Sequence, residues 1–328
     1  MFSVRIRKGV IAALPSIGPR SRMLVPPLIL ACQGTPSAGT APASWHPIVI
    51  AQTKTQPHWN SANLSKKDIK TMKVVILAGG VGSRLSEETT LRPKPLVEIG
   101  GNPMIWHIMN IYAHHGMTDF IVCAGYKGYM LKEYFANFVL HNSDFTADFS
   151  DNSLQFHSRT APRWRVTVID TGQGSMTGGR LRNIRHHLDA DESFCMTYGD
   201  GVGDIDLTAE LAFHRSHGLK ATMCAVHPPA RFGAIITDGI HVTAFSEKMS
   251  GEGPRINGGF FILEPSVIDL IEGDDTIWEA GPLEQLASEG QLAAYEHNGF
   301  WQPMDTLRER HQLEELWRSG AAPWKVWR

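Results

Sequence analysis

The chain has no apolar run of eighteen residues, so its sequence offers no candidate for a membrane-spanning helix. It also lacks a pair of cysteines at metal-ligand spacing, because Cys32, Cys123, Cys195 and Cys224 are widely scattered. The last three lie in short apolar runs, which predicts small core residues in a reducing compartment. These features favour a cytoplasmic protein that does not bind membranes.

A broad excess of basic residues is also missing from most of the chain. Residues 1–71 carry nine Lys or Arg and one acidic residue, whereas residues 72–328 carry 22 basic and 32 acidic residues. A general nucleic-acid binder needs an extended basic face, so this class of function is disfavoured. The 328 residues, 42% of them hydrophobic, suffice for one large α/β domain or two small ones.

Residues 1–71 show neither helical nor strand periodicity and contain eight prolines. We expect them to be a disordered extension, or a segment placed before the true start at Met72 by a mis-called start codon. The arginine-rich, acid-poor beginning also resembles a transit peptide, and an export signal is a further alternative.

A glycine-rich loop follows the apolar run 74–78 in the segment Leu77-Ala-Gly-Gly-Val-Gly-Ser-Arg-Leu85. Glycines after a buried strand turn tightly and direct backbone N–H groups at an anion, although a plain tight turn is the alternative. Arg84 and Lys94, the latter between two prolines, add positive charge and favour a phosphate site. Position 85 is not the third glycine of a dinucleotide-binding loop, and no Gly-Lys-Ser/Thr follows, which excludes a Walker loop.

From Met72 onward, short apolar runs alternate with amphipathic stretches. Strands are expected at 73–78, 120–124, 166–170, 194–198 and 221–226, and helices at 103–115, 129–138, 180–188 and 207–217. This alternation predicts an α/β fold with a doubly wound, mostly parallel, Rossmann-like sheet, whose ligands bind at the carboxyl ends of the strands.

After residue 229 the pattern is richer in strands. A hairpin over 232–247, strands at 257–263, 292–296 and 300–304, and a final helix at 307–317 are expected. We therefore divide 72–328 into a nucleotide-binding part, 72–229, and a smaller β-rich sugar-binding part, 230–328. Residues 141–165 are polar and irregular, and are interpreted either as an insertion that packs on a neighbouring subunit or as a solvated loop.

Two aspartates are candidate metal ligands. Asp200 follows the apolar run 194–198 between glycines, so its carboxylate can project from a strand end. Asp305 precedes the last predicted helix, where an ordinary helix N-cap is the alternative. One or two carboxylates that share a magnesium ion with substrate phosphates suit phosphoryl chemistry. The histidine pairs at 114–115, 186–187 and 214/217 lack a third ligand and are not expected to bind metal.

The chain resembles the sugar-1-phosphate nucleotidyltransferases from Met72 almost to Arg328. The resemblance rests on the glycine-rich loop, Lys94-Pro-Leu-Val, Tyr198-Gly-Asp-Gly201, Asn257-Gly-Gly-Phe-Phe and Phe300-Trp-Gln-Pro-Met-Asp-Thr306. Several segments, including Ser175-Met-Thr-Gly-Gly-Arg180, are similar to the branch that transfers cytidylyl groups. This implies transfer from CTP to glucose 1-phosphate with Mg²⁺, yielding CDP-glucose for surface polysaccharide, in an enzyme that forms homo-oligomers.

The resemblance also implies a role for individual residues. Arg84, Lys94 and Asp200 are implied as catalytic, and Asp200 and Asp305 as metal ligands. The implied nucleotide contacts are Leu77, Ala78, Gly79, Gly80, Val81, Gly82, Ser83, Ser175 and Arg180. The implied sugar-phosphate contacts are Glu247, Lys248, Asn257, Gly258 and Gly259.

Purely structural interpretations of these segments and rival functions remain open at this point. Composition alone also allows a capped helix start at 175–180, a solvated strand end at 247–248 and a β-bulge at 257–259. The rival functions are the same transfer from TTP or UTP, a non-catalytic sensor of nucleotide sugars, and a nicotinamide-dependent oxidoreductase.

Overall fold

The computed structural model describes residues 66–158, 161–229, 234–238, 241–246 and 254–328. Most of the segment expected to be an extension, residues 1–65, lies outside this range, so that expectation stays a prediction. Its last six residues differ from the expectation of disorder, because Lys66–Thr71 form helix α1 immediately before the first strand.

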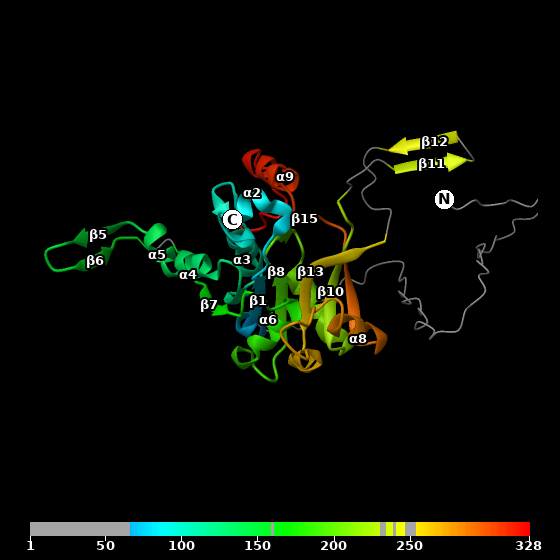
Figure 1. Cartoon of the computed structure of the whole chain (residues 1–328), viewed down its shortest axis with the longest axis horizontal. Helices are drawn as coiled ribbons and strands as arrows, with labels where there is room; N and C mark the ends of the chain where they lie inside the picture. The colour runs from blue at the N-terminus through cyan, green and yellow to red at the C-terminus, as the bar shows by residue number, and fades with distance from the viewer. Residues whose placement is uncertain (1–65, 159–160, 230–233, 239–240, 247–253) are drawn as a thin grey trace, which may run out of the picture. The chain divides into compact units, whose positions relative to one another are not determined.

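The core of the chain is a seven-stranded sheet with the strand order β14-β10-β13-β8-β1-β4-β7 (Figure 1). All neighbouring strands are parallel except that β13 runs antiparallel to both β8 and β10, so the predicted, mostly parallel α/β sheet is confirmed. The strands are β1 (Lys73–Ala78), β4 (Asp119–Ala124), β7 (Arg165–Asp170), β8 (Phe194–Tyr198), β10 (Ala221–Val226), β13 (Ile256–Leu263) and β14 (Leu292–His297).

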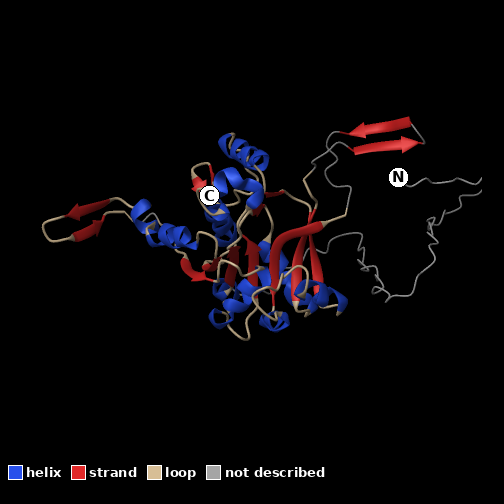
Figure 2. Ribbon diagram, viewed as in Figure 1, coloured by secondary structure: helices blue, strands red, loops and turns tan. Residues whose placement is uncertain are grey.

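Helices cover both faces of this sheet (Figure 2). Side chains of a strand point alternately to its two faces, so Val74 and Ile76 of β1 belong to one core and Val75 and Leu77 to the other. The first core includes residues from α3 (Met104–His114), α4 (Gly128–Ala136), α7 (Leu207–His217) and α9 (Leu307–Arg318). The second includes residues from α6 (Thr177–Asn183) and α8 (Pro282–Ser288).

The expected division at residue 230 does not separate two sheets. Strands β13 and β14 come from the second part of the chain, yet both lie in the central sheet. The small hairpin of β11 (Ala234–Asp238) and β12 (His241–Ser246) forms where a hairpin was predicted. Residues after 230 therefore contribute two strands to the same sheet as residues 72–229.

Smaller elements account for most differences from the predicted pattern. The helix expected over 129–138 ends at Ala136 and is followed by α5 (Phe138–His141), and the helix expected over 180–188 begins earlier, at Thr177. Unpredicted elements are α2 (Ser86–Thr89), α8, the 3-10 turns Ser83–Leu85, Lys94–Leu96, Arg185–His187 and Pro265–Leu270, the strand pair β2 (Glu98–Ile99) with β3 (Asn102–Pro103), and β9 (Gly201–Gly203). Strand β9 pairs with β15 (Trp301–Pro303), which lies within the strand expected at 300–304.

The segment expected to be irregular, residues 141–165, contains a regular hairpin of β5 (Phe145–Asp148) and β6 (Ser153–Phe156). Its large apolar side chains are exposed, with 89% of Phe149 and 53% of Leu154 accessible to solvent. Cross-strand pairing, rather than burial, gives this hairpin its regular form.

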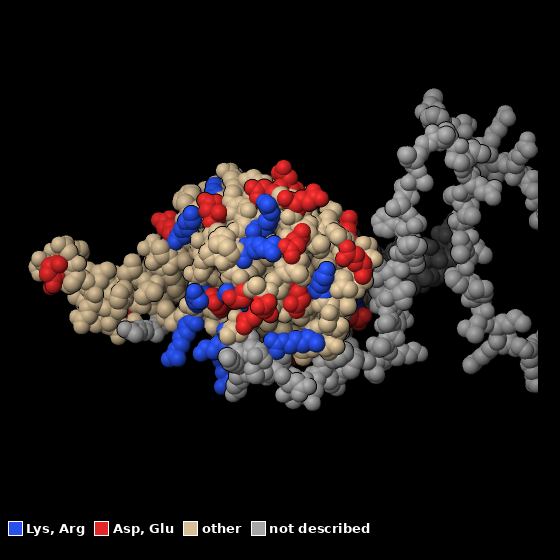
Figure 3. All heavy atoms as spheres, turned by 90° about the horizontal axis from the view of Figure 1, so that it is seen from below, with Lys and Arg blue, Asp and Glu red and all other residues tan. Residues whose placement is uncertain are grey.

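Two further expectations concern the core and the surface. Cys123, Cys195 and Cys224 are buried and free, as predicted. On the face seen in Figure 3, Lys and Arg side chains are interspersed with Asp and Glu side chains rather than gathered in one basic patch. No helix in the described part of the chain is both long and apolar enough to cross a membrane.

Candidate active site

A cavity of about 910 Å³ opens beside the carboxyl ends of β1 and β8, on the rim where the sequence predicts ligands to bind. It is lined by Leu77, Ala78, Gly79, Gly80, Gly82, Ser83, Arg84, Lys94, Pro95, Ser175, Met176, Thr177, Arg180, Tyr198, Gly199, Asp200, Pro228, Pro229, Ile256, Trp301, Pro303 and Asp305. All the catalytic and metal-binding candidates, and every nucleotide-binding candidate except Val81, are therefore brought to one cavity.

The glycine-rich loop turns at Gly82, whose φ of +67° lies in the left-handed region that favours glycine. The loop passes directly into the 3-10 turn Ser83–Leu85, and Thr89 donates hydrogen bonds to the carbonyls of Gly82 and Leu85, both at 3.1 Å. Val81 lies at the exposed tip of the loop, with 54% of its surface accessible.

Gly79 is a glycine for a different reason. A Cβ atom at this position would lie 2.1 Å from the Nη1 of Arg180, so only a residue without a side chain leaves room for the guanidinium. The first glycine of the loop therefore accommodates a neighbouring side chain.

The guanidinium of Arg180 is almost fully buried and donates to four oxygens around it. The acceptors are the carbonyls of Ala124, Gly172 and Gly79 and the hydroxyl of Thr171, at 2.8 to 3.3 Å. These oxygens follow or end strands β1, β4 and β7, so Arg180 ties three strand ends together beneath the cavity. Most N–H donors of the Arg180 guanidinium already have partners within the protein. Its expected contact with the nucleotide stays a prediction.

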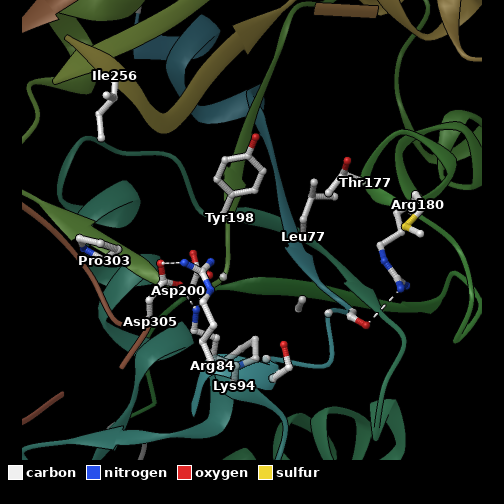
Figure 4. Close-up of a pocket in the computed structure, with 18 of the residues that line it drawn as sticks. Leu77, Arg84, Lys94, Thr177, Arg180, Tyr198, Asp200, Ile256, Pro303 and Asp305 are labelled. Carbon is white, nitrogen blue, oxygen red and sulfur yellow. Dashed lines mark hydrogen bonds and ion pairs between the residues drawn. The ribbon is translucent and has the colours of Figure 1, made fainter. Parts of the chain in front are cut away.

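Lys94 lies at the centre of a charged cluster (Figure 4). Its Nζ is 2.7 Å from Asp200 Oδ2 and 2.6 Å from Asp305 Oδ1. Arg84 adds a second cation, with Nη1 2.8 Å from Asp305 Oδ2 while 70% of the Arg84 side chain stays exposed. The glycine-rich loop, the lysine and two aspartates that are 105 positions apart in the sequence thus meet in space.

The backbone explains how the two aspartates come together. Strand β9 begins directly after Asp200 and pairs antiparallel with β15, so that Gly201 lies opposite Pro303. The N–H of Met304 also donates to the carbonyl of Asp200 at 2.8 Å. Because Asp305 comes two residues after the end of β15, this pairing places it beside Asp200.

Asp305 is not the N-cap of the last helix, which was the alternative role considered for it. Thr306 caps α9 and forms a capping box with Glu309, since each side chain bonds to the other's backbone N–H. The Asp305 N–H donates to the same Glu309 carboxylate at 2.8 Å. The carboxylate of Asp305 is thus directed at Lys94 rather than at the helix.

The charge state of Lys94 is set by burial and by its two carboxylate partners. Burial alone would lower the pKa of the Lys94 ammonium, but the nearby carboxylates of Asp200 and Asp305 outweigh this effect and raise it above its usual value. Lys94 therefore remains charged at neutral pH.

The donor set of this cluster also fits a hard divalent cation. Oxygen atoms of two carboxylates converge on one ammonium, so they can also share a magnesium ion that takes its other ligands from phosphate and water. Within the described ranges, no group of three or more His, Cys, Asp or Glu could hold a metal. The buried His214 instead bonds to Thr222 and Glu264.

The start of α6 is tied to the segment that contains Asp274 and Thr276. The N–H groups of Met176 and Gly178 donate to the carbonyls of Asp274 and Thr276, at 2.8 and 2.9 Å, so they are not available to an anion. Ser175 lines the cavity, but its hydroxyl donates to the carbonyl of Thr171 at 2.6 Å. Ser175 as a nucleotide contact stays a prediction.

None of the five predicted sugar-phosphate contacts is among the described residues that line the cavity. Glu247 and Lys248 lie outside the described residues. Asn257, Gly258 and Gly259 are not among the described residues that line the cavity, and the register shift between β10 and β13 at this point is the β-bulge considered as the alternative. The Trp301 Nε1, however, donates to the Gly258 carbonyl at 2.7 Å.

Sequence reasoning missed part of the cavity wall. Tyr198 and Thr177 both line the cavity, and in the view of Figure 4 the Tyr198 ring lies above the charged cluster and Thr177 lies to its right. Tyr198 could have been predicted to lie near the site, because it stands two positions before Asp200. Nothing in the sequence indicates which residues its hydroxyl contacts.

Comparisons with known proteins agree with this geometry. The family model described as "Nucleotidyl transferase" matches residues 73–304. A glucose-1-phosphate cytidylyltransferase of Salmonella typhi is 57% identical over 256 residues, which cover 78% of this chain and 100% of that protein. A probable glucose-1-phosphate cytidylyltransferase of Bacillus subtilis is 40% identical over 257 residues, with the same coverage of both proteins.

A solved structure supports the fold assignment. A putative glucose-1-phosphate thymidylyltransferase from Bacillus anthracis in complex with a sucrose has a TM-score of 0.55 and 18% identity, and covers 79% of this chain and 98% of that chain. At this identity the likeness shows the fold alone. Together with the family match and the relatives of high identity, it shows that the chain belongs to the nucleotidyl transferase family.

Proposed function

We propose that the chain transfers a cytidylyl group from CTP to glucose 1-phosphate, releasing pyrophosphate and forming CDP-glucose. The observation that carries this proposal is the Lys94 ammonium held between Asp200 and Asp305 at the edge of a glycine-lined cavity. The choice of CTP and glucose 1-phosphate rests on the two relatives that bear this activity in their names, at 57% and 40% identity.

The reaction needs positioning and charge neutralisation more than covalent help from the protein. A phosphate oxygen of glucose 1-phosphate attacks the α-phosphorus of CTP, and the bond to the β-phosphate breaks as pyrophosphate leaves on the opposite side. Lys94 and Arg84 offset the negative charge of the triphosphate, and the loop from Gly79 to Ser83 holds its phosphates. Asp200 and Asp305 would hold Mg²⁺, which supplies further neutralisation of phosphate charge when bound.

The sugar end of the cavity is assigned to its less charged wall. Tyr198, Ile256 and Trp301 line this wall. Asn257 and Gly259 contact Tyr198, and the Gly258 carbonyl accepts a hydrogen bond from Trp301. We infer that the sugar binds between this wall and the charged cluster. A nucleotide triphosphate as substrate also favours the cytoplasm as the site of action.

We further propose that copies of the chain associate through the β5–β6 hairpin. Phe145, Phe149, Leu154 and Phe156 are all more than 40% exposed, and an apolar hairpin of this kind gains stability by burial against a second copy. Sedimentation of the full chain is expected to show an oligomer that Phe149→Ser with Leu154→Ser weakens. A monomer at every concentration of the wild type would contradict this assignment.

The substrate assignment is tested by pyrophosphate release with glucose 1-phosphate and each of CTP, TTP, UTP and ATP at equal concentration. CTP is expected to react faster than the other pyrimidine triphosphates by about tenfold or more, the scale of discrimination by a few pocket contacts. A preference for TTP or UTP would replace the nucleotide in this proposal. Binding without release of pyrophosphate from any of them would favour a non-catalytic sensor.

The role of Lys94 is tested by Lys94→Ala, with Lys73→Ala as the matched control. Both changes remove a lysine paired with aspartate at 2.6 Å, but Lys73 and its partner Asp189 lie outside the cavity. Turnover at saturating substrates is expected to fall about a hundredfold or more for Lys94→Ala, because a preorganised charge is lost, and to stay near wild type for Lys73→Ala. Equal turnover in the two variants would remove Lys94 from the mechanism.

A further inference from the structure

The carboxylate of Glu279 joins two walls of the cavity without lining it. One of its oxygens accepts a hydrogen bond from the hydroxyl of Tyr198, and the other accepts one from the hydroxyl of Thr177 at 2.7 Å. Both hydroxyl residues line the cavity, Tyr198 at the end of β8 and Thr177 at the start of α6. One side chain thus connects two elements that carry candidate substrate contacts.

The first arm of this connection leads to the sugar side. Tyr198 comes two residues before Asp200, and its hydroxyl also receives a long hydrogen bond, 3.4 Å, from the Asn257 amide. Its ring is packed so closely against β13 that a Cβ at Gly259 would lie 2.5 Å from Tyr198 Cδ2. The bond to Glu279 therefore fixes both the ring and the hydroxyl that Asn257 contacts.

The second arm leads to the nucleotide side. Thr177 is the first residue of α6, and its hydroxyl oxygen also accepts from the N–H of Trp278 at 2.9 Å. The segment 274–279 lies over the start of this helix so closely that a Cβ at Gly179 would be 2.3 Å from the Asp274 carbonyl oxygen. Ser175 precedes this helix start and Arg180 follows it.

The fold has another anchor for this segment. Trp278 is fully buried and packs edge-on against Phe261, with ring centroids 6.2 Å apart. The backbone hydrogen bonds from Met176 and Gly178 to Asp274 and Thr276 hold the same segment on α6. The carboxylate of Glu279 is therefore not needed to keep the segment in place.

We propose that Glu279 is a positioning residue that holds Tyr198 for the sugar phosphate and Thr177 for the nucleotide, so that both walls are formed before the substrates bind. Binding residues that are already ordered lower the entropic cost of substrate binding, and binding residues that are misplaced weaken substrate affinity. This inference rests on the proposed function of the cavity, and it assigns binding rather than bond making to Glu279.

Three variants separate the two arms. Tyr198→Phe removes the hydroxyl of the sugar-side arm, and Thr177→Val removes the hydroxyl of the nucleotide-side arm together with the acceptor of the Trp278 N–H. Glu279→Gln cannot accept from both hydroxyls at once. Glu284→Gln is the matched control, because Glu284 is an exposed carboxylate of α8 outside the cavity lining. Calorimetric titrations give the Kd of glucose 1-phosphate and of CTP, and initial rates give the two KM values and kcat.

The expected result is a split between the substrates. Tyr198→Phe raises the Kd and KM of glucose 1-phosphate about tenfold and leaves those of CTP within about twofold, on the scale of one charge-assisted hydrogen bond. Thr177→Val does the reverse, and Glu279→Gln raises both while kcat stays within about threefold. Tyr198→Phe added to Glu279→Gln changes glucose 1-phosphate binding little further, because both act on one bond.

Unchanged affinities in Glu279→Gln would overturn the inference, as would equal losses for both substrates in Tyr198→Phe. A lower thermal unfolding midpoint in Glu279→Gln with no change in either Kd would show a purely structural role. Because the titrations do not require turnover, the split can be seen even in a protein that makes no CDP-glucose. That outcome would reject the proposed reaction and leave the role of Glu279 standing, whereas failure to bind either substrate would reject both.

Discussion

The ion pairs of Lys94 with Asp200 and Asp305 are the contacts on which the rest of the site depends. Two carboxylates side by side repel each other, and they are stable in one place because a cation lies between them. The same arrangement keeps Lys94 charged and directs both carboxylates at one point. In the proposed function, Asp200 and Asp305 would hold the metal ion and Lys94 would offset phosphate charge from positions that are already fixed, which is how a preorganised site lowers the cost of the reaction.

The scaffold places these charges through backbone pairing rather than through long side chains. Lys94 is set by flanking prolines in a 3-10 turn, Asp200 by the end of β8, and Asp305 by the pairing of β15 with β9. Arg180 and Glu279 join loops from different strands around the same cavity. The hydrogen bonds of these two residues therefore limit the movement of the loops and side chains that line the cavity beside them.

Much of the sheet could be predicted because its strands are short apolar runs that end in glycine or polar residues, and β1, β8 and β10 have the predicted bounds. The approach of Asp200 to the glycine-rich loop could be expected from strand ends that share one rim, whereas the places of Lys94 and Asp305 were implied by the family resemblance. The pairing of β9 with β15 could not, because three-residue strands carry no periodicity. Nor could the hydrogen bond from Arg180 to Gly79 or the one from Thr177 to Glu279, which join positions about a hundred residues apart and depend on the packed tertiary structure.

The central claim is that Asp200 and Asp305 act as one pair on one metal ion. The most direct test is the magnesium dependence of turnover in Asp200→Asn, Asp305→Asn and the double variant. Asp189→Asn is the control, because Asp189 lies outside the cavity. If the two carboxylates serve one ion, each single change lowers turnover at limiting Mg²⁺ by about a hundredfold or more, and the double variant loses less than about threefold beyond either. Losses that multiply in the double variant, or a wild-type magnesium dependence in either single variant, would contradict the account.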